Sequence, residues 1–212
     1  MKILSIDTSS SSGSLALLEE DRLLGEISLE ARTTYSEKLM ESINQLFKMT
    51  GESLDSLGGI AVAQGPGTFT GLRIGMGVAK AMAYALDKPL WGISNLQALA
   101  FSADLQEGKI LALIDARQGE FFGAGFEISE GKLGAVFIEE TLLRAQDWWA
   151  LCQDQDLSFV TMNDKTYEVF VREGVDWKKK PVTLSVKPVS AHGVGSLAWL
   201  RFQKKERDDP LT

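Results

Sequence analysis

The sequence predicts an α/β protein built from two related lobes, because one order of elements occurs twice along the chain. In each half an apolar strand ends at an aspartate, a tight turn leads to a second strand, and a helix and another strand follow. The first copy starts with residues 3–6 and Asp7, and the second starts with residues 109–114 and Asp115. A hairpin followed by a helical crossover predicts mixed sheets flanked by helices.

In the first half, the hydrophobic pattern predicts a three-stranded meander, a helix, a short buried strand and a long helix. These elements are expected at residues 3–6, 14–18, 24–29, 36–49, 60–63 and 70–86. The all-apolar run at 60–63 is typical of a strand inside a parallel sheet. In the second half, strands are expected at 109–114, 121–126, 136–138 and 159–162, and a helix at 144–152.

We place the first lobe at residues 1–105 and the second at 106–189, and we expect a C-terminal helix at 190–205 to complete the first lobe. This order of elements resembles the RNase H-like lobe pair of the actin, sugar-kinase and Hsp70 superfamily. A shared order of elements indicates a fold and leaves the function open.

Charge and composition exclude some functions. The 29 acidic residues outnumber the 22 basic ones, whereas a protein that holds a nucleic-acid backbone usually presents a basic face. The two basic clusters, Lys178–Lys180 and Lys204–Lys205 with Arg207, are interpreted as solvated surface. With one cysteine, Cys152, and no apolar run of about 20 residues, we expect a cytoplasmic chain with no membrane contact.

A glycine-rich segment from Gln64 to Gly75 lies between the predicted strand and the long helix. Such a loop can present backbone N–H groups to an anion. It is not a nucleotide-binding P-loop, because no Gly-Lys-Ser/Thr follows. A tight turn and a phosphate contact therefore both remain open. The candidate nucleotide or phosphate contacts are Asp7, Thr8, Ser9, Gly65, Gly67 and Asp115.

The long helix carries small residues at every fourth position and apolar residues in most other directions. Either the helix at 36–49 covers it within the lobe, or both helices present a surface to a second chain. We favour the second interpretation, since small residues let another helix approach closely. The expected contact residues are Leu39, Ile43, Leu46, Phe47, Gly71, Leu72, Gly75, Met76 and Ala79. Gly75→Leu is then expected to disrupt dimerisation and leave the monomer folded.

Four segments resemble the TsaB (YeaZ) family of tRNA threonylcarbamoyladenosine biosynthesis. They are the long motif at 65–75, the opening at 3–9, the second-lobe hairpin at 115–120 and the first helix at 35–39. The resemblance covers residues 1–126. Two departures are Tyr35, where many members have histidine, and the end at Pro210–Thr212, where relatives continue into a short tail.

The resemblance implies a non-catalytic scaffold that pairs with a TsaD-like catalytic subunit through the two N-terminal helices. With a TsaE-like ATPase, the pair would support transfer of a threonylcarbamoyl group to the tRNA adenosine beside the anticodon. It also implies a homodimer when the chain is alone, only indirect contact with tRNA, and no cofactor of its own, although ATP or ADP could be shared at the joint.

Residue types argue against an independent active site. His192 is the sole histidine, so a histidine pair for zinc or iron cannot form. We expect no catalytic and no metal-binding residues. Two alternatives stay open: a small-molecule kinase or ATPase of the same superfamily, and a glycoprotease-like metallopeptidase, which the histidine count disfavours.

Overall fold

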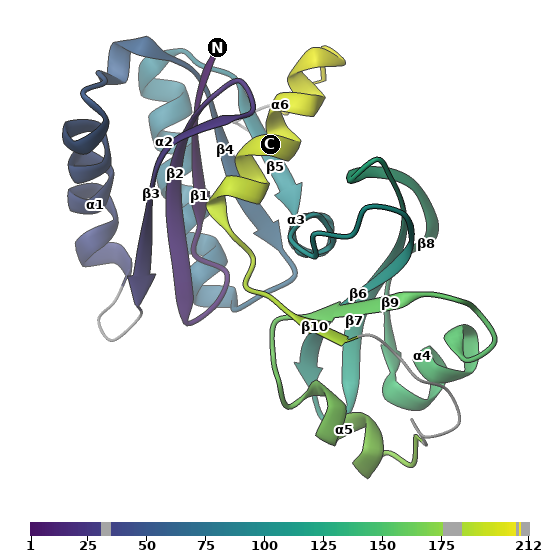
Figure 1. The fold of residues 1–212 in the computed structure, drawn as a ribbon. Coiled ribbons are helices and arrows are strands. Elements are labelled where there is room, and N and C mark those ends of the chain that lie inside the picture. The colour runs from purple at the N-terminus through teal and green to yellow at the C-terminus, as the bar shows by residue number, and fades with distance from the viewer. Residues whose placement is uncertain (31–34, 176–183, 207, 209–212) are drawn as a thin grey trace. The chain divides into compact units, whose positions relative to one another are not determined.

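The computed structural model describes residues 1–30, 35–175, 184–206 and 208, which form two compact units (Figure 1). Unit 1 comprises Met1–Ala98 and Val189–Thr212, and unit 2 comprises Leu99–Pro188. The lysine cluster at 178–180, Arg207 and residues 210–212 lie outside the described residues, as does the side chain of Tyr35. None of the helices in the described ranges has the length and apolar character needed to span a bilayer.

Unit 1 contains a five-stranded sheet of order β3-β2-β1-β4-β5. Strand β1 is antiparallel to β2 and parallel to β4, and β5 continues the parallel part. The elements are β1 (Lys2–Asp7), β2 (Ser12–Glu19), β3 (Arg22–Glu30), α1 (Tyr35–Thr50), η1 (Leu54–Ser56), β4 (Leu57–Gly65), α2 (Phe69–Leu86), β5 (Leu90–Ser94), α3 (Asn95–Phe101) and α6 (Ala191–Gln203).

Unit 2 repeats this sheet. Its order is β8-β7-β6-β9-β10, with β6 antiparallel to β7 and parallel to β9. The elements are β6 (Gly108–Arg117), β7 (Glu120–Ser129), β8 (Lys132–Arg144), α4 (Ala145–Cys152), β9 (Ser158–Thr161), α5 (Thr166–Arg172) and β10 (Leu184–Val186). The predicted fold class is confirmed. Sequence reasoning missed β5, α3, α5 and β10.

The core of unit 1 occupies both faces of its sheet, because helices cover each face. Leu4 and Ile6 of β1 belong to the cluster that α1 and α2 complete. Ser5 points to the opposite face, where α6 lies so close that a Cβ at Gly195 would be 2.9 Å from the Ser5 hydroxyl. Burial on both faces explains why β1 reads as an almost continuous apolar run.

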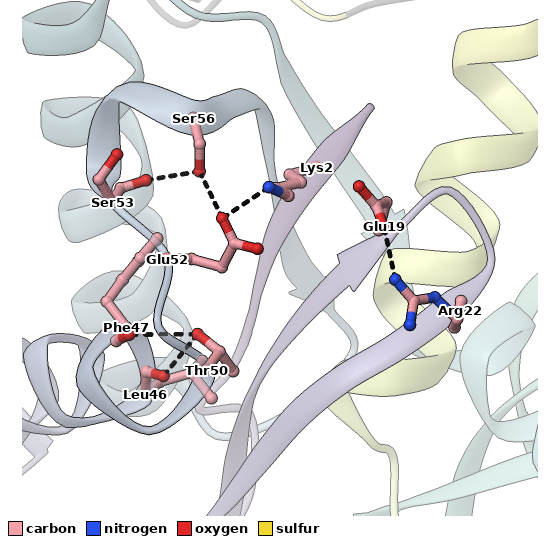
Figure 2. A network of polar contacts seen from close by, with 9 residues as sticks. All are labelled: Lys2, Glu19, Arg22, Leu46, Phe47, Thr50, Glu52, Ser53 and Ser56. Carbon is pink, nitrogen blue, oxygen red and sulfur yellow. Dashed lines mark hydrogen bonds and ion pairs between the residues drawn. The ribbon is translucent and has the colours of Figure 1, made fainter.

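A polar network fastens the start of β1 to the chain that leads from α1 to β4 (Figure 2). Lys2 Nζ donates to Glu52 Oε2 at 2.6 Å, and both side chains are only about one-fifth exposed. Ser56 Oγ donates to the Ser53 carbonyl at 2.7 Å and lies 3.4 Å from Glu52 Oε2. The partly buried ion pair therefore links the start of β1 to the segment that precedes β4.

The small-residue stripe of α2 faces the sheet of its own unit. Gly71 and Gly75 are buried. A Cβ at Gly71 would lie 1.9 Å from the Thr8 carbonyl oxygen, and a Cβ at Gly75 would lie 2.3 Å from the Thr8 hydroxyl. The stripe lets α2 approach the turn after β1. The expectation that these small residues admit a helix of a second chain is therefore wrong, because they face the sheet of their own unit.

This packing also corrects most of the predicted partner contacts. Leu39, Ile43, Leu46 and Phe47 of α1 are buried in the core of unit 1, together with Gly71, Gly75 and Ala79 of α2. Leu72 and Met76 are half-buried. The buried side chains among them offer almost no surface to a partner. For the same reason Gly75→Leu is expected to damage the fold rather than an interface.

We predict that Gly71→Ala lowers the free energy of unfolding by about 2–3 kcal/mol, because the new methyl group meets backbone that cannot move aside. Gly77→Ala, at a position on the same helix with nothing within 4 Å of the added Cβ, should instead raise it by about 0.5–1 kcal/mol through helix propensity. Urea unfolding followed by tryptophan fluorescence measures both. Equal effects of the two variants would contradict this account of the stripe.

Candidate functional site

The carboxyl ends of β1, β4 and β5 meet at one edge of the unit 1 sheet and bring polar residues together there. Asp7 ends β1 and is fully buried. Its Oδ1 accepts the Ser9 N–H at 2.9 Å. Among the described residues, neither Asp7 Oδ2 nor Ser9 Oγ has a hydrogen-bond partner, although both atoms are buried. Ligands of open α/β sheets bind at this kind of edge.

The loop between β4 and α2 is held against this turn by backbone contacts. The Thr68 N–H donates to the Ser9 carbonyl at 2.7 Å, and the Thr8 hydroxyl donates to the Gly71 carbonyl at 2.7 Å. A Cβ at Gly67 would lie 2.6 Å from the Ser9 carbonyl oxygen. The glycine motif thus permits a close approach of two backbone segments. This favours the tight-turn interpretation over a loop that is open to a phosphate.

Asn95 completes the site, and sequence reasoning missed it. It is buried at the start of α3, where Oδ1 accepts the Gly65 N–H at 3.1 Å and Nδ2 donates to the Pro66 carbonyl at 3.0 Å. The side chain therefore fixes Gly65 and Pro66 near the start of the glycine motif. An available signal was the polar pair Ser94–Asn95 after the apolar run at 90–93, but that run was not identified as a strand.

Burial raises the pKa of Asp7 to about 6, although the nearby Ser9 hydroxyl and the hydrogen bond from the Ser9 N–H both act in the opposite direction. The carboxylate is therefore ionised at neutral pH at a cost in stability. A buried acid with a perturbed pKa and an unpartnered oxygen at a sheet edge is a candidate functional residue. Thr8, Ser9, Gly65 and Gly67 do lie around it, as the sequence suggested, and their contact with a nucleotide remains a prediction.

Asp115 occupies the matching position in unit 2. Its Oδ1 accepts the Arg117 N–H at 2.7 Å, which repeats the turn made by Asp7, but Asp115 is exposed. At the junction of β9 and α5, polar groups bond to each other: the hydroxyls of Thr161 and Thr166 are 2.8 Å apart, and Asn163 Oδ1 accepts the Lys165 N–H. A role for Asp115 in phosphate contact remains a prediction.

The outward side of α2 is a second candidate site, which we call the α2 face. It comprises Phe69, Arg73, Gly77, Ala81 and Tyr84, all of them exposed. The residues Phe69 and Tyr84 are 72% and 73% exposed, and the Arg73 guanidinium carbon lies 5.2 Å from the centroid of the Phe69 ring. An open pocket lies between Phe69, Thr70, Arg73 and Ile74. Exposed aromatic and arginine side chains are the types that dominate protein–protein contacts.

The remaining reactive residue types are one histidine and one cysteine. His192 is at the start of α6, where its backbone N–H donates to Glu26 at 3.4 Å, and Cys152 is buried in the core of unit 2. In the ranges that the structure describes, histidine, cysteine, aspartate and glutamate side chains form no group of three or more suited to a metal ion.

We predict that the stability difference between Asp7→Asn and the parent depends on pH. A carboxyl whose pKa is raised on folding contributes stability below its unfolded pKa, near 3.8, and loses it as the pH rises through about 6. Above pH 7 the asparagine variant should therefore be more stable by about 2–3 kcal/mol, while still accepting the Ser9 N–H. The gain should disappear near pH 4 in urea unfolding. A difference that does not vary with pH would contradict the raised pKa.

Comparison of the sequence with known proteins identifies the family to which the chain belongs. The model of the TsaD family, tRNA N6-adenosine threonylcarbamoyltransferase, matches residues 25–173. The "tRNA threonylcarbamoyladenosine biosynthesis protein TsaB" of Bacillus subtilis is 33% identical over 156 residues, which cover 74% of this chain and 68% of the relative. The protein of the same name from Escherichia coli is 34% identical over 66% of this chain, and the match spans 61% of its length.

Solved structures agree with the sequence comparison. YeaZ from Pseudomonas aeruginosa superimposes with a TM-score of 0.83 and 25% identity over 100% of this chain and 98% of its own. A ROK family protein from Streptococcus pneumoniae aligns with a TM-score of 0.50 and 12% identity over 97% of this chain and 100% of its own, a likeness of fold alone. The extent of the sequence matches and the two repeated sheets together show that the chain belongs to the TsaB family.

Proposed function

We propose that this chain is an accessory subunit in threonylcarbamoyladenosine synthesis on tRNA, and that it docks on a TsaD-like catalytic subunit through the α2 face and the neighbouring α1. The names of its relatives and the match to the TsaD family model support the pathway. The observation that carries the docking surface is the exposure of Phe69, Arg73 and Tyr84 along one side of a helix whose other side is fixed to the sheet.

The shape of the α2 face suits a helix of a partner. Gly77 lies at its middle with nothing within 4 Å of an added Cβ, so a partner's backbone can approach closely there. Phe69 and Tyr84 lie at opposite ends of α2 and can act as aromatic anchors. Met40 and Met49 add exposed apolar side chains on α1. The interface is thus proposed on the outward residues of the two predicted helices, in place of the buried ones.

Docking would act on the catalytic subunit by stabilising its competent conformation, which is a population shift and not a chemical step of this chain. A TsaE-like ATPase would join the pair, and the chain would contact tRNA only indirectly. A homodimer through the α2 face is the expected state of the chain alone. Any ATP or ADP would bind at the interface between this chain and its partner subunits.

We predict that Gly77→Leu weakens binding to a TsaD-like subunit at least about ten-fold, because the new side chain fills the point of closest approach. Ala150→Leu, at an exposed position of α4 in unit 2, is the matched control and should bind normally. Affinity is measured by titration calorimetry, and modification of tRNA is measured in a reconstituted system with and without the chain. Normal binding by Gly77→Leu, with unfolding unchanged, would exclude the α2 face as the interface.

A kinase or ATPase of the same fold is the second candidate, and the buried Asp7 with its unpartnered Oδ2 is the observation that favours it. That hypothesis requires ATP hydrolysis by the lone chain and its loss in Asp7→Asn. We expect phosphate release at background level from both proteins. Turnover by the parent that Asp7→Asn abolishes would instead establish the kinase-like function.

A further inference from the structure

The Arg73 guanidinium is a cation of the α2 face that has no counter-ion in the described part of the chain. Its carbon lies 5.2 Å from the centroid of the Phe69 ring. Among the residues that the structure describes, no oxygen accepts a hydrogen bond from it and no carboxylate forms an ion pair with it. Arg22, Arg172 and Arg201, by contrast, are ion-paired to acids of the chain. The donors of Arg73 are therefore available to a group outside the chain.

The guanidinium and the Phe69 ring line the same open pocket. The two residues are one helical turn apart, a spacing at which side chains of a helix meet. A guanidinium within about 6 Å of an aromatic centroid is attracted to the face of the ring. The pocket has a volume of about 270 Å³ and is lined by Phe69, Thr70, Arg73 and Ile74. A guanidinium held in this way suits a carboxylate, which it can bind through two parallel hydrogen bonds.

Helix α2 cannot supply that carboxylate to another copy of itself. Its 18 residues include the cations Arg73 and Lys80 and no aspartate or glutamate. If two copies met at Gly77 around a two-fold axis, Arg73 would face Ala81 of the second copy in an antiparallel pair, or Arg73 of that copy in a parallel pair. Either arrangement buries a guanidinium without an acceptor, which weakens association.

We propose that the α2 face recognises a partner helix that carries an acidic side chain, and that Arg73 binds this carboxylate in the pocket beside Phe69. The requirement selects such a partner over a second copy of the chain, because a copy leaves the guanidinium unpaired. This selection rests on the proposed function, in which the α2 face is the docking surface. The carboxylate is thus the group that a TsaD-like subunit must present.

An acidic helix fits the α2 face better than the other common anion, the phosphate backbone of a nucleic acid. Proteins that hold such a backbone usually neutralise several phosphates with lysine and arginine side chains. The α2 face has one exposed cation, Arg73, between the exposed rings of Phe69 and Tyr84. Aromatic residues with a single arginine are typical of a contact with another protein.

The test titrates the full chain and its variants with a TsaD-like subunit by calorimetry. Arg73→Met keeps a long side chain beside Phe69 but removes the charge, and it should weaken binding at least about ten-fold. Arg73→Glu should weaken binding further, because it places a second carboxylate in the pocket. Arg144→Met is the matched control, since Arg144 is an exposed arginine of unit 2, and it should bind normally. Urea unfolding confirms that each variant is folded.

Self-association should change in the opposite direction, which a general packing role of Arg73 would not produce. In sedimentation velocity, Arg73→Met should dimerise at least about five-fold more tightly than the parent, since an unpaired charge no longer enters the contact. Glu41 is an exposed acid of α1, and Glu41→Gln should leave the dimer unchanged. Unchanged or weaker dimerisation of Arg73→Met, or weaker dimerisation of Glu41→Gln, would overturn the selection against copies.

The titrations also separate the carboxylate contact from the docking surface itself. Normal binding by Arg73→Met together with weak binding by Gly77→Leu would overturn the carboxylate contact and keep the docking surface. Normal binding by both variants would overturn both. Equal losses in Arg73→Met and Arg73→Glu would exclude an acidic group on the partner. With tRNA in place of the subunit we expect no binding, and binding by the parent that Arg73→Met abolishes would assign the pocket to a phosphate backbone instead.

Discussion

The approach of α2 to the turn after β1 is the contact on which unit 1 depends. Gly71 and Gly75 bring the helix against Thr8, and the bond from Thr68 to Ser9 aligns the glycine loop with the same turn. One consequence is that the turn carrying Asp7 cannot move independently of the helix that carries the α2 face. The buried Asp7 and the proposed docking surface on α2 therefore belong to elements that are packed tightly against each other.

Burial of the ionised Asp7 lowers the stability of the fold, although the turn that Asp7 makes does not require a buried carboxylate. The exposed Asp115 makes the same turn in unit 2 with its carboxyl group in water, so the turn itself needs no buried charge. At this turn the two units differ in the surroundings of the aspartate, which is buried in unit 1 and exposed in unit 2. Contact of the Asp7 carboxylate with a nucleotide remains a prediction.

Unit 1 exposes two surfaces of different character. The α2 face offers aromatic side chains and a glycine on a helix whose position is fixed by its buried side. The β5 edge offers backbone groups that are occupied by Asp208 and Arg201. The first surface is therefore presented to solvent, whereas the backbone groups of the second already have partners within the chain.

The sequence by itself determined the fold class, the family and the place of Asp7, since strand–turn–helix order and a long glycine motif are local features that need no knowledge of packing. It did not determine which side of α2 meets solvent. Small residues occur on two sides of that helix, and only the position of Thr8 in the folded sheet decides that Gly75 is buried and Gly77 exposed. The contacts of Asn95 with Pro66 and of Asp208 with Gly92 were likewise beyond reach, because each joins residues that lie 29 or more positions apart and are brought close only by the tertiary structure.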